Sequence, residues 1–238
     1  MLLELRDVER VYRVGGEDVR ALDGIDLALE AGEFVAVTGP SGAGKSTLLH
    51  ILGALDTPNS GSVRFDGDEI GSLGDRAQSQ FRLHRVGFVF QFFNLLPTLT
   101  AWENVAVPRL LGGQSLASAR PAATRLLESV GLGDRAEHRP AELSGGQMQR
   151  VAVARALMMD PPVVLADEPT GNLDSKTGRE ILDLLGALAK DSEKPRLVVI
   201  VTHDRAAAAR ADRRVTLVDG KVRADTRSAD AMIAEAAR

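Results

Sequence analysis

The chain has 238 residues, of which 44% are hydrophobic and 26% charged, so it has enough apolar side chains for a sizeable core and is neither disordered nor collagen-like. It has no cysteine, which excludes a disulfide scaffold, a Cys-ligated zinc site, an iron–sulfur cluster and a thiol nucleophile. Its 29 basic and 33 acidic residues give a net charge of -4, which is not typical of a nucleic-acid-binding protein.

At this length we expect one compact domain over residues 1–225, followed by a C-terminal tail at 226–238. No stretch approaches the roughly 20 apolar residues of a membrane-spanning helix. Acidic side chains at Glu4 and Asp7 stand where a signal peptide requires an apolar segment. The sequence therefore predicts a cytoplasmic protein that does not span a membrane.

The N-terminal part of the chain predicts a small antiparallel sheet. Up to residue 37, short alternating segments are separated by glycine-containing breaks. Residues 34–37 form an apolar strand that leads through a glycine-rich turn into a helix at 45–55. Further along, residues 63–70 predict a hairpin and residues 86–90 a buried strand.

Helices and apolar strands alternate in the second half of the chain. Residues 94–140 are mostly helical, which together with the next helix predicts an inserted helical subdomain at about 94–160. Apolar strands that do not alternate are buried on both faces. The sequence therefore predicts an α/β fold, with a mostly parallel sheet covered by helices and the small antiparallel sheet attached. The expected elements are helices at 119–130, 144–159, 175–189 and 204–211 and strands at 163–166, 197–202, 215–218 and 221–222.

The glycine-rich segment after the strand at 34–37 matches the phosphate-binding P-loop pattern. Backbone N–H groups in such a loop turn inward around phosphates, and the helix N-terminus adds partial positive charge. Lys45 is placed to reach the terminal phosphates, and the Ser46 hydroxyl suits Mg²⁺. A flexible turn would explain the glycines but not the lysine and the hydroxyl at these offsets. The segment consists of Gly39, Pro40, Ser41, Gly42, Ala43, Gly44, Lys45, Ser46 and Thr47.

Two acids follow the apolar strand at 163–166. A magnesium ion that keeps several waters needs a carboxylate at the end of a neighbouring strand, and we assign Asp167 to that role. Glu168 is then free to accept a proton from a water that attacks a γ-phosphate. Acids also cap helices and end strands, so this interpretation depends on the P-loop.

A second potential anion site opens the helix at 144–159. A hydroxyl N-cap followed by two glycines presents free N–H groups and the positive end of the helix dipole. The segment has no lysine, so it is either an ordinary capped helix or a site that completes the phosphate site of another copy of the chain. Its residues are Ser144, Gly145, Gly146 and Gln147.

With these motifs in this order, nearly the whole chain resembles the ATP-binding cassette (ABC) ATPases. The segment 143–147 is similar to the family signature, Gln91 to the Q-loop glutamine and His203 to the switch histidine. Asp174 lies in a segment that resembles the D-loop. Tyr12 stands where the family places an aromatic that stacks on adenine, although a lone aromatic beside a strand also suits a core position.

The resemblance implies an Mg²⁺-dependent ATPase that works as a head-to-tail homodimer. Two ATP molecules would lie between the P-loop of one copy and the 144–146 segment of the other. His203 would hydrogen-bond the γ-phosphate, and Gln91 would hold Mg²⁺ or water and report the nucleotide state to a partner. A histidine after an apolar strand is otherwise more often structural.

Aromatic residues gather around Gln91. We expect strand residues such as Phe88 to pack the helical subdomain onto the sheet. Others are expected to line a groove for a partner protein, namely Phe92 and Phe93 together with Leu95 and Leu96. In the family this region, here Gln91 to Leu96, receives the coupling helix of a membrane permease. The stretches 87–97, 103–105 and 166–175 resemble the macrolide-exporter, lipoprotein-release and cell-division branch, whose permeases have few membrane helices. The aromatic residues are Phe88, Phe90, Phe92, Phe93 and Trp102.

The leading hypothesis is an ATPase subunit that lies on the inner face of the cell membrane through a separate permease, with no nucleic-acid partner. The alternative is a soluble ABC ATPase in nucleic-acid repair, translation or cluster assembly, although such proteins usually carry paired cassettes, insertions or basic surfaces. An ordinary P-loop kinase or GTPase would share Lys45 and Asp167 but leave the 143–147 segment and His203 unexplained.

Overall fold

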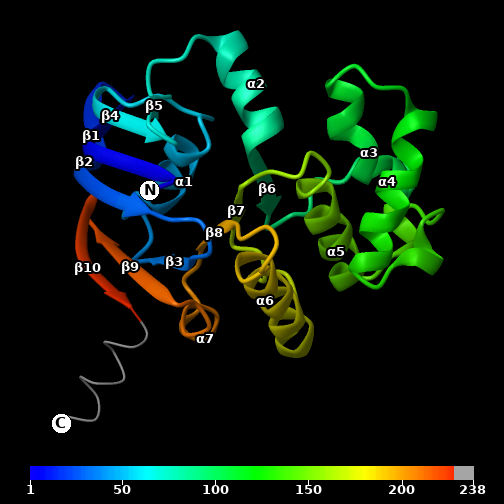
Figure 1. The fold of residues 1–238 in the computed structure, drawn as a ribbon. Coiled ribbons are helices and arrows are strands. Elements are labelled where there is room, and N and C mark those ends of the chain that lie inside the picture. Colours follow the sequence, from blue (N-terminus) through cyan, green and yellow to red (C-terminus); the bar gives the residue numbers. More distant parts are fainter. Residues whose placement is uncertain (228–238) are drawn as a thin grey trace.

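The computed structural model describes residues 1–227, so nearly all of the expected tail at 226–238 lies outside the described residues. Figure 1 shows an antiparallel sheet at one end of the molecule, a group of helices at the other and the main sheet between them. The expected α/β fold with a mostly parallel sheet is confirmed.

The small sheet consists of β1 (Leu3–Val14), β2 (Glu17–Leu29), β4 (Ser60–Phe65) and β5 (Asp68–Glu69). Its order is β2-β1-β4-β5, and every pair is antiparallel. The hairpin expected at residues 63–70 is the β4–β5 pair, in which Phe65 lies opposite Asp68.

The main sheet consists of β3 (Phe34–Thr38), β6 (Val86–Phe90), β7 (Val163–Asp167), β8 (Leu197–Val201), β9 (Arg213–Val218) and β10 (Lys221–Arg227). Its order is β10-β9-β3-β8-β7-β6. All neighbours pair in parallel except β10, which is antiparallel to β9. The carboxyl ends of β3, β8, β7 and β6 therefore lie at one edge of the sheet, the edge where α/β proteins place their ligands.

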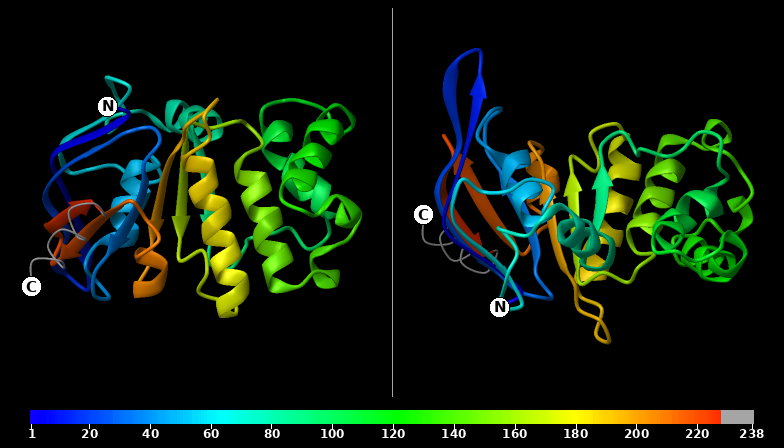
Figure 2. Two further views of the ribbon diagram at one scale, coloured as in Figure 1. Left: turned by 60° about the horizontal axis from the view of Figure 1, so that its bottom comes forward. Right: turned by 90° about the horizontal axis from the view of Figure 1, so that it is seen from above.

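The helices are α1 (Lys45–Leu52), α2 (Asp75–Arg85), α3 (Ala101–Leu111), α4 (Leu116–Ser129), α5 (Gly145–Ala156), α6 (Ser175–Ala189) and α7 (Arg205–Ala208), with 3₁₀ turns at Gly133–Arg135 and Pro140–Glu142. Figure 2 shows α5 and α6 side by side, with α3 and α4 beyond α5. Capping boxes begin α3 at Thr100 and α5 at Ser144, which satisfies backbone donors at both helix starts.

Several expected boundaries differ from the structure. The helix α4 begins at Leu116 instead of residue 119, and α7 covers only part of the expected 204–211. The strand β10 continues to Arg227, past the expected domain boundary at 225. The helix α2 was not expected at all, because none of its residues is buried and no apolar face marks it in the sequence.

Apolar side chains form three clusters that fix the layers. Alternate residues of the main sheet point to opposite faces, so Val35 and Val37 join one cluster while Phe34 and Ala36 join another. The first cluster contains the buried leucines of α1, which lies between the two sheets. The second lies under α6 and α7, and the third is formed within the helical subdomain by α3, α4 and α5.

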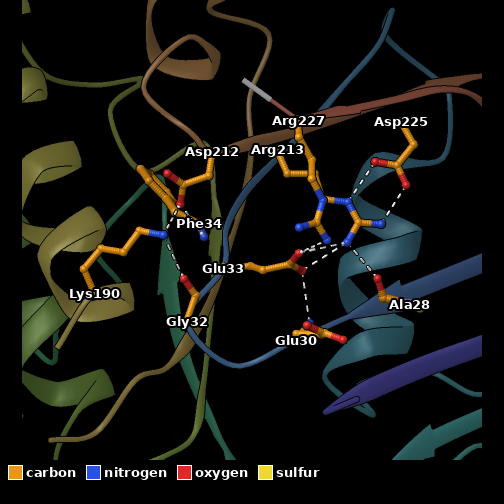
Figure 3. Close-up of polar contacts among 10 residues, drawn as sticks. All are labelled: Ala28, Glu30, Gly32, Glu33, Phe34, Lys190, Asp212, Arg213, Asp225 and Arg227. Atoms are coloured by element: carbon orange, nitrogen blue, oxygen red, sulfur yellow. Dashed lines mark hydrogen bonds and ion pairs between the residues drawn. The ribbon is translucent and has the colours of Figure 1, made fainter. Parts of the chain in front are cut away.

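Charged residues join β9 and β10 to the turn that precedes β3 (Figure 3). Arg213 donates to Asp225 at 2.6 and 2.8 Å, to Glu33 at 3.0 Å and to the carbonyl of Ala28 at 2.8 Å. Arg227 also donates to Glu33, at 2.9 Å. Because only 10% of the Arg213 side chain is exposed, these bonds satisfy a guanidinium that has lost most of its water.

Candidate functional site

The P-loop connects β3 to α1. Gly39 and Gly44 have φ angles of 147° and 95°, and a Cβ atom at either position would lie about 2 Å from a backbone oxygen of a neighbouring strand. Lys45 Nζ donates to the carbonyls of Gly39 and Pro40, at 2.9 and 2.8 Å. The loop is therefore folded around its own lysine. Of the other residues, Ala43 is buried, Thr47 is half-buried, and Pro40, Ser41, Gly42 and Ser46 are exposed.

Asp167, the last residue of β7, lies beside the P-loop. Burial raises the pKa of its carboxyl above the ordinary value, while a hydrogen bond from Ser46 acts in the opposite direction. The neighbouring charge of Glu168 raises the pKa further. The structure thus brings together a hydroxyl and a half-buried carboxylate whose charged form a cation would stabilise.

Glu168 and His203 are in direct contact. Glu168 has a left-handed backbone, with a φ of 46°, and its N–H donates to Val201 at the end of β8. One carboxylate oxygen accepts from His203 N at 3.1 Å and lies 2.7 Å from His203 Nδ1, and the other accepts from Thr202 Oγ1 at 3.3 Å. The hydrogen bond between the His203 ring and the Glu168 carboxylate raises the pKa of His203, whose side chain is 75% exposed.

Gln91 follows β6 and lies against the loop after Glu168. Its Nε2 is 3.5 Å from Asn172 Oδ1, and Asn172 Nδ2 donates to the Gln91 carbonyl at 3.0 Å. A Cβ atom at Gly171 would lie 2.8 Å from Gln91 Nε2. The side chain of Gln91 therefore contacts the chain segment that carries Glu168.

Ser144 caps α5 at the start of the second potential anion site. Gln147 N donates to Ser144 Oγ at 3.3 Å, and Ser144 N donates to Gln147 Oε1 at 2.9 Å. A Cβ atom at Gly146 would lie 2.2 Å from Thr177 Cγ2 of α6, whereas one at Gly145 would lie 3.5 Å or more from its neighbours. Gly146 therefore allows α5 and α6 to approach each other.

Asp174 caps α6. Its carboxylate accepts from the backbone N–H groups of Lys176 and Thr177, at 3.0 and 3.1 Å, and from Thr177 Oγ1 at 2.6 Å. The bond from the Thr177 hydroxyl lowers the pKa of Asp174 below its ordinary value. In this structure the side chain thus serves the helix start.

Tyr12 projects from β1 and is held at two points. Its hydroxyl donates to Asp56 Oδ2 at 2.6 Å, and the guanidinium carbon of Arg10 lies 4.7 Å from the ring centroid. Arg10 also pairs with Asp56, at 2.8 Å. One face of the ring is therefore occupied by a cation.

Some of these residues form a row along one edge of the main sheet. The P-loop follows β3, His203 follows β8, Asp167 ends β7 with Glu168 directly after it, and Gln91 follows β6. A lysine, a carboxylate pair and a histidine at the same edge suit the binding and hydrolysis of a nucleoside triphosphate. The 144–147 segment begins a separate helix, α5, and is not part of this row.

The match to a known family excludes an ordinary P-loop kinase or GTPase. A family model described as "ABC transporter" matches residues 22–171. The chain belongs to the ABC transporter family. It is an ABC ATPase, the ATP-binding and ATP-hydrolysing part of such a transporter, and the expected resemblance is confirmed.

Relatives place this ABC ATPase in the expected branch. The lipoprotein-releasing system ATP-binding protein LolD of Geobacter metallireducens is 50% identical over 224 residues, which cover 94% of this chain and 99% of LolD. The macrolide export ATP-binding/permease protein MacB of Hyphomonas neptunium is 46% identical over 235 residues, 99% of this chain. The chain spans 36% of the length of that MacB.

A solved ABC ATPase has the same fold. The structure of the dimeric ATP-binding cassette MJ0796, in a post-hydrolysis state bound to ADP and Pi, has a TM-score of 0.86 and 42% sequence identity. The alignment covers 95% of this chain and 99% of MJ0796.

The ABC ATPase also has an apolar groove whose lining the sequence did not indicate. Its volume is about 690 Å³, and it lies between α2, β6, α3 and α5. Phe90, Asn94 and Arg155 connect the groove to the segment that follows Gln91, and Leu111, with 74% of its surface exposed, lies at its margin. The lining comes from elements far apart in the sequence, so no local motif marks it.

The aromatic residues that line this groove are Phe88 and Phe90, whereas Phe92 and Phe93, which we expected to line a groove, are not among its lining residues. Trp102 is buried in the helical subdomain, and Phe88 packs against the cluster around α1. Phe92 is 71% exposed, and Leu96 on the same segment is 47% exposed.

Within residues 1–227, no helix is both long enough and apolar enough to cross a bilayer.

Proposed function

We propose that this ABC ATPase works as a head-to-tail homodimer that drives a separate membrane permease of the LolD/MacB type. The row at the sheet edge carries this proposal, because Lys45, Asp167 and Glu168 would act on a bound nucleotide from one side only. The capped start of α5, with Ser144 and Gly146, belongs to a different element from that row and would complete the site of a second copy.

Ser46 and Asp167 are the residues that would hold Mg²⁺, with Gln91 as a further oxygen donor. Among residues 1–227, no three His, Cys, Asp or Glu side chains gather in a way that would hold a metal alone. A small ligand set of this kind suits Mg²⁺, which usually keeps several waters and binds substrate phosphates. The ion would neutralise charge on the β- and γ-phosphates when bound.

The other site residues have separate roles in the proposed reaction. Lys45 would leave its loop carbonyls for phosphate oxygens, and Tyr12 would stack on adenine. Glu168 would accept the proton of the attacking water once its carboxylate leaves His203. His203 would then be free to donate a hydrogen bond to the γ-phosphate. Asp174 would act at the dimer interface through the start of α6.

The groove between α2, α3 and α5 is where we propose that the coupling helix of the permease docks. Its lining is mostly apolar, and Phe92 and Leu96, close in sequence to its lining residues Phe90 and Asn94, are exposed. Binding there would place the ATPase on the inner face of the membrane. The names of its relatives mention lipoprotein release and macrolide export. Lipoproteins and macrolides are therefore the cargo classes that we propose to test.

The test uses Glu168→Gln. This change removes the proton acceptor but keeps the shape of the side chain, so we expect hydrolysis to fall about 100-fold or more while ATP still binds. ATP hydrolysis by phosphate release and ATP affinity by equilibrium titration check both parts. Unchanged hydrolysis would remove Glu168 from its assigned role.

The same variant identifies the partner. When the Glu168→Gln protein is purified from native membranes in mild detergent with ATP, we expect a permease with few membrane helices and a large external domain to co-purify. A permease with many helices would contradict the branch assignment. A dimer without any membrane partner would favour the alternative of a soluble ABC ATPase.

A further inference from the structure

The segment after Gln91 contains a turn of unusual backbone conformation. Phe93 and Asn94 both have left-handed backbones, with φ angles of 60° and 49°. Two consecutive non-glycine residues in this region are unfavourable and persist only where the surroundings hold them. The carbonyls of these same two residues accept hydrogen bonds from Arg155 of α5, at 2.8 and 2.5 Å.

Arg155 is placed at some energetic cost. It is half-buried on an otherwise apolar stretch of α5, and burial lowers the pKa of its guanidinium. Within the described part of the chain, no carboxylate forms an ion pair with it, so its hydrogen bonds go to the turn carbonyls instead. The planar guanidinium binds both carbonyls at once, which a lysine ammonium does not reproduce.

Gln149, earlier on α5, makes a similar connection. Its side chain is fully buried, and its Nε2 donates to Pro169 at 2.7 Å and to Phe90 at 3.4 Å. These carbonyls belong to the residues next to Glu168 and Gln91. The ring of Phe93 also lies 3.8 Å from the Cβ position of Gly145. The segment 90–94 is thus bound to α5 over most of the helix length.

We propose that Arg155 is a positioning residue that joins the Phe93–Asn94 turn to α5, so that the turn and the Ser144 end of the helix move as one body. The proposal rests on the head-to-tail dimer of the proposed function. Because Asn94 and Arg155 both line the groove, a partner that docks there would move the end of α5 that faces the second copy. Without Arg155, the turn would move relative to α5, and dimerisation would have to restore their relative position at the expense of affinity.

The experiment compares Arg155→Lys with Arg150→Lys, both in a Glu168→Gln background. Arg150 is the matched control, since it lies on the same helix and also binds a carbonyl, that of Val130, but contacts no residue of the turn. ATP-driven dimerisation is measured by sedimentation velocity. ATP affinity is measured separately at protein concentrations where the chain stays monomeric.

We expect Arg155→Lys to weaken dimerisation about 10-fold, because it loses charge-assisted hydrogen bonds, with unchanged ATP affinity of the monomer. Arg150→Lys should dimerise like its parent. A parent-like dimer for Arg155→Lys would overturn the inference and leave the proposed function intact. Equal losses of dimerisation and ATP affinity would also overturn it, because they indicate general damage. A parent that does not dimerise with ATP would overturn both proposals.

Hydrogen exchange of the chain with its native Arg155 provides a second test that does not depend on folding of the variant. As ATP is titrated into the Glu168→Gln protein, the amides of residues 91–96 and 145–150 should become protected at the same ATP concentration. Protection of one segment without the other would show that they do not move together.

Discussion

Glu168 shows how one residue combines backbone strain with a side chain engaged in hydrogen bonds. Its left-handed backbone turns the chain directly after β7, and its carboxylate accepts bonds from Thr202 and His203. In this arrangement the assigned base and the assigned γ-phosphate donor are bound to each other. Hydrolysis by the proposed mechanism requires that this pair separate.

The pKa of His203 reports this contact. Replacing Glu168 by Gln removes the negative charge, so we expect the pKa of His203 to fall towards its ordinary value of 6.5. Titration of the histidine ring protons by NMR measures the change, and His203→Ala assigns the resonance. An unchanged pKa would mean that Glu168 does not contact His203 in solution.

The raised pKa of His203 also determines in which direction pH changes the stability of the fold. Because the pKa of His203 is raised in the folded protein, its contact with Glu168 favours folding fully below pH 6.5. The contribution is lost as the pH rises through the higher folded-state pKa. With an exposed side chain we expect a small effect, visible as a difference between the parent and His203→Ala in urea unfolding at pH 5.5 and pH 8.5.

Residues in short local motifs were predictable, and residues that act across the fold were not. The P-loop spacing and the acids at 167 and 168 can be read from adjacent positions. Arg155 and Gln149 belong to no such motif, although a charge inside the apolar run of α5 was a visible signal. The anchoring of Tyr12 by Asp56 joins residues far apart in the sequence, and no local pattern indicates it.

At the scale of elements, the close approach of α5 and α6 depends on Gly146. Its replacement by Ala places a methyl group against Thr177 Cγ2, so we expect a loss of about 1–3 kcal/mol of unfolding free energy. Thr177 cannot rotate freely, because its hydroxyl is bound to Asp174. Urea unfolding measures the loss.

Thr177→Ser provides the matched background, since it removes the colliding methyl group but keeps the hydroxyl. There, Gly146→Ala should be neutral or stabilising, because Ala favours a helix over Gly by about 1 kcal/mol. An equal loss in both backgrounds would place the effect elsewhere than in the contact between the helices.

The strands β9 and β10 depend on the Arg213 network. Its bond to Asp225 raises the pKa of Arg213, so the charged form is favoured in the folded protein. We expect Arg213→Met to cost about 2–3 kcal/mol of unfolding free energy, because it leaves the carboxylates of Glu33 and Asp225 without their shared partner. The control is Arg6→Met, which breaks an exposed pair with Glu4 and should change stability by less than about 1 kcal/mol. Similar losses would contradict a structural role for the network.

Elements with a buried apolar face were predictable from the sequence. The main-sheet strands appear there as apolar runs, because both of their faces are covered. The helix α2 has no buried residue and could not be recognised by an apolar face. Boundaries such as the start of α4 depend on caps and tertiary contacts more than on composition.

For the whole molecule, the order of strands in space decides which residues meet. The segments of the row follow one another in the chain as the P-loop, Gln91, Asp167 and His203, but along the sheet β8 lies between β3 and β7. His203 is thereby placed between the P-loop and Glu168. Local sequence patterns predicted the strands but not this order, because strand pairing is a property of the complete fold.

The third apolar cluster gives the helical subdomain a core of its own. Leu126 and Leu184 are the half-buried leucines that contact both this cluster and the one under α6. A part with a separate core need not melt together with its neighbour, so in calorimetry we expect an unfolding enthalpy larger than the van't Hoff value. ATP bound to the P-loop would raise the melting temperature of the main-sheet part by mass action. On heating, the two parts would then unfold at different temperatures, and the difference between the two melting temperatures would depend on the nucleotide concentration.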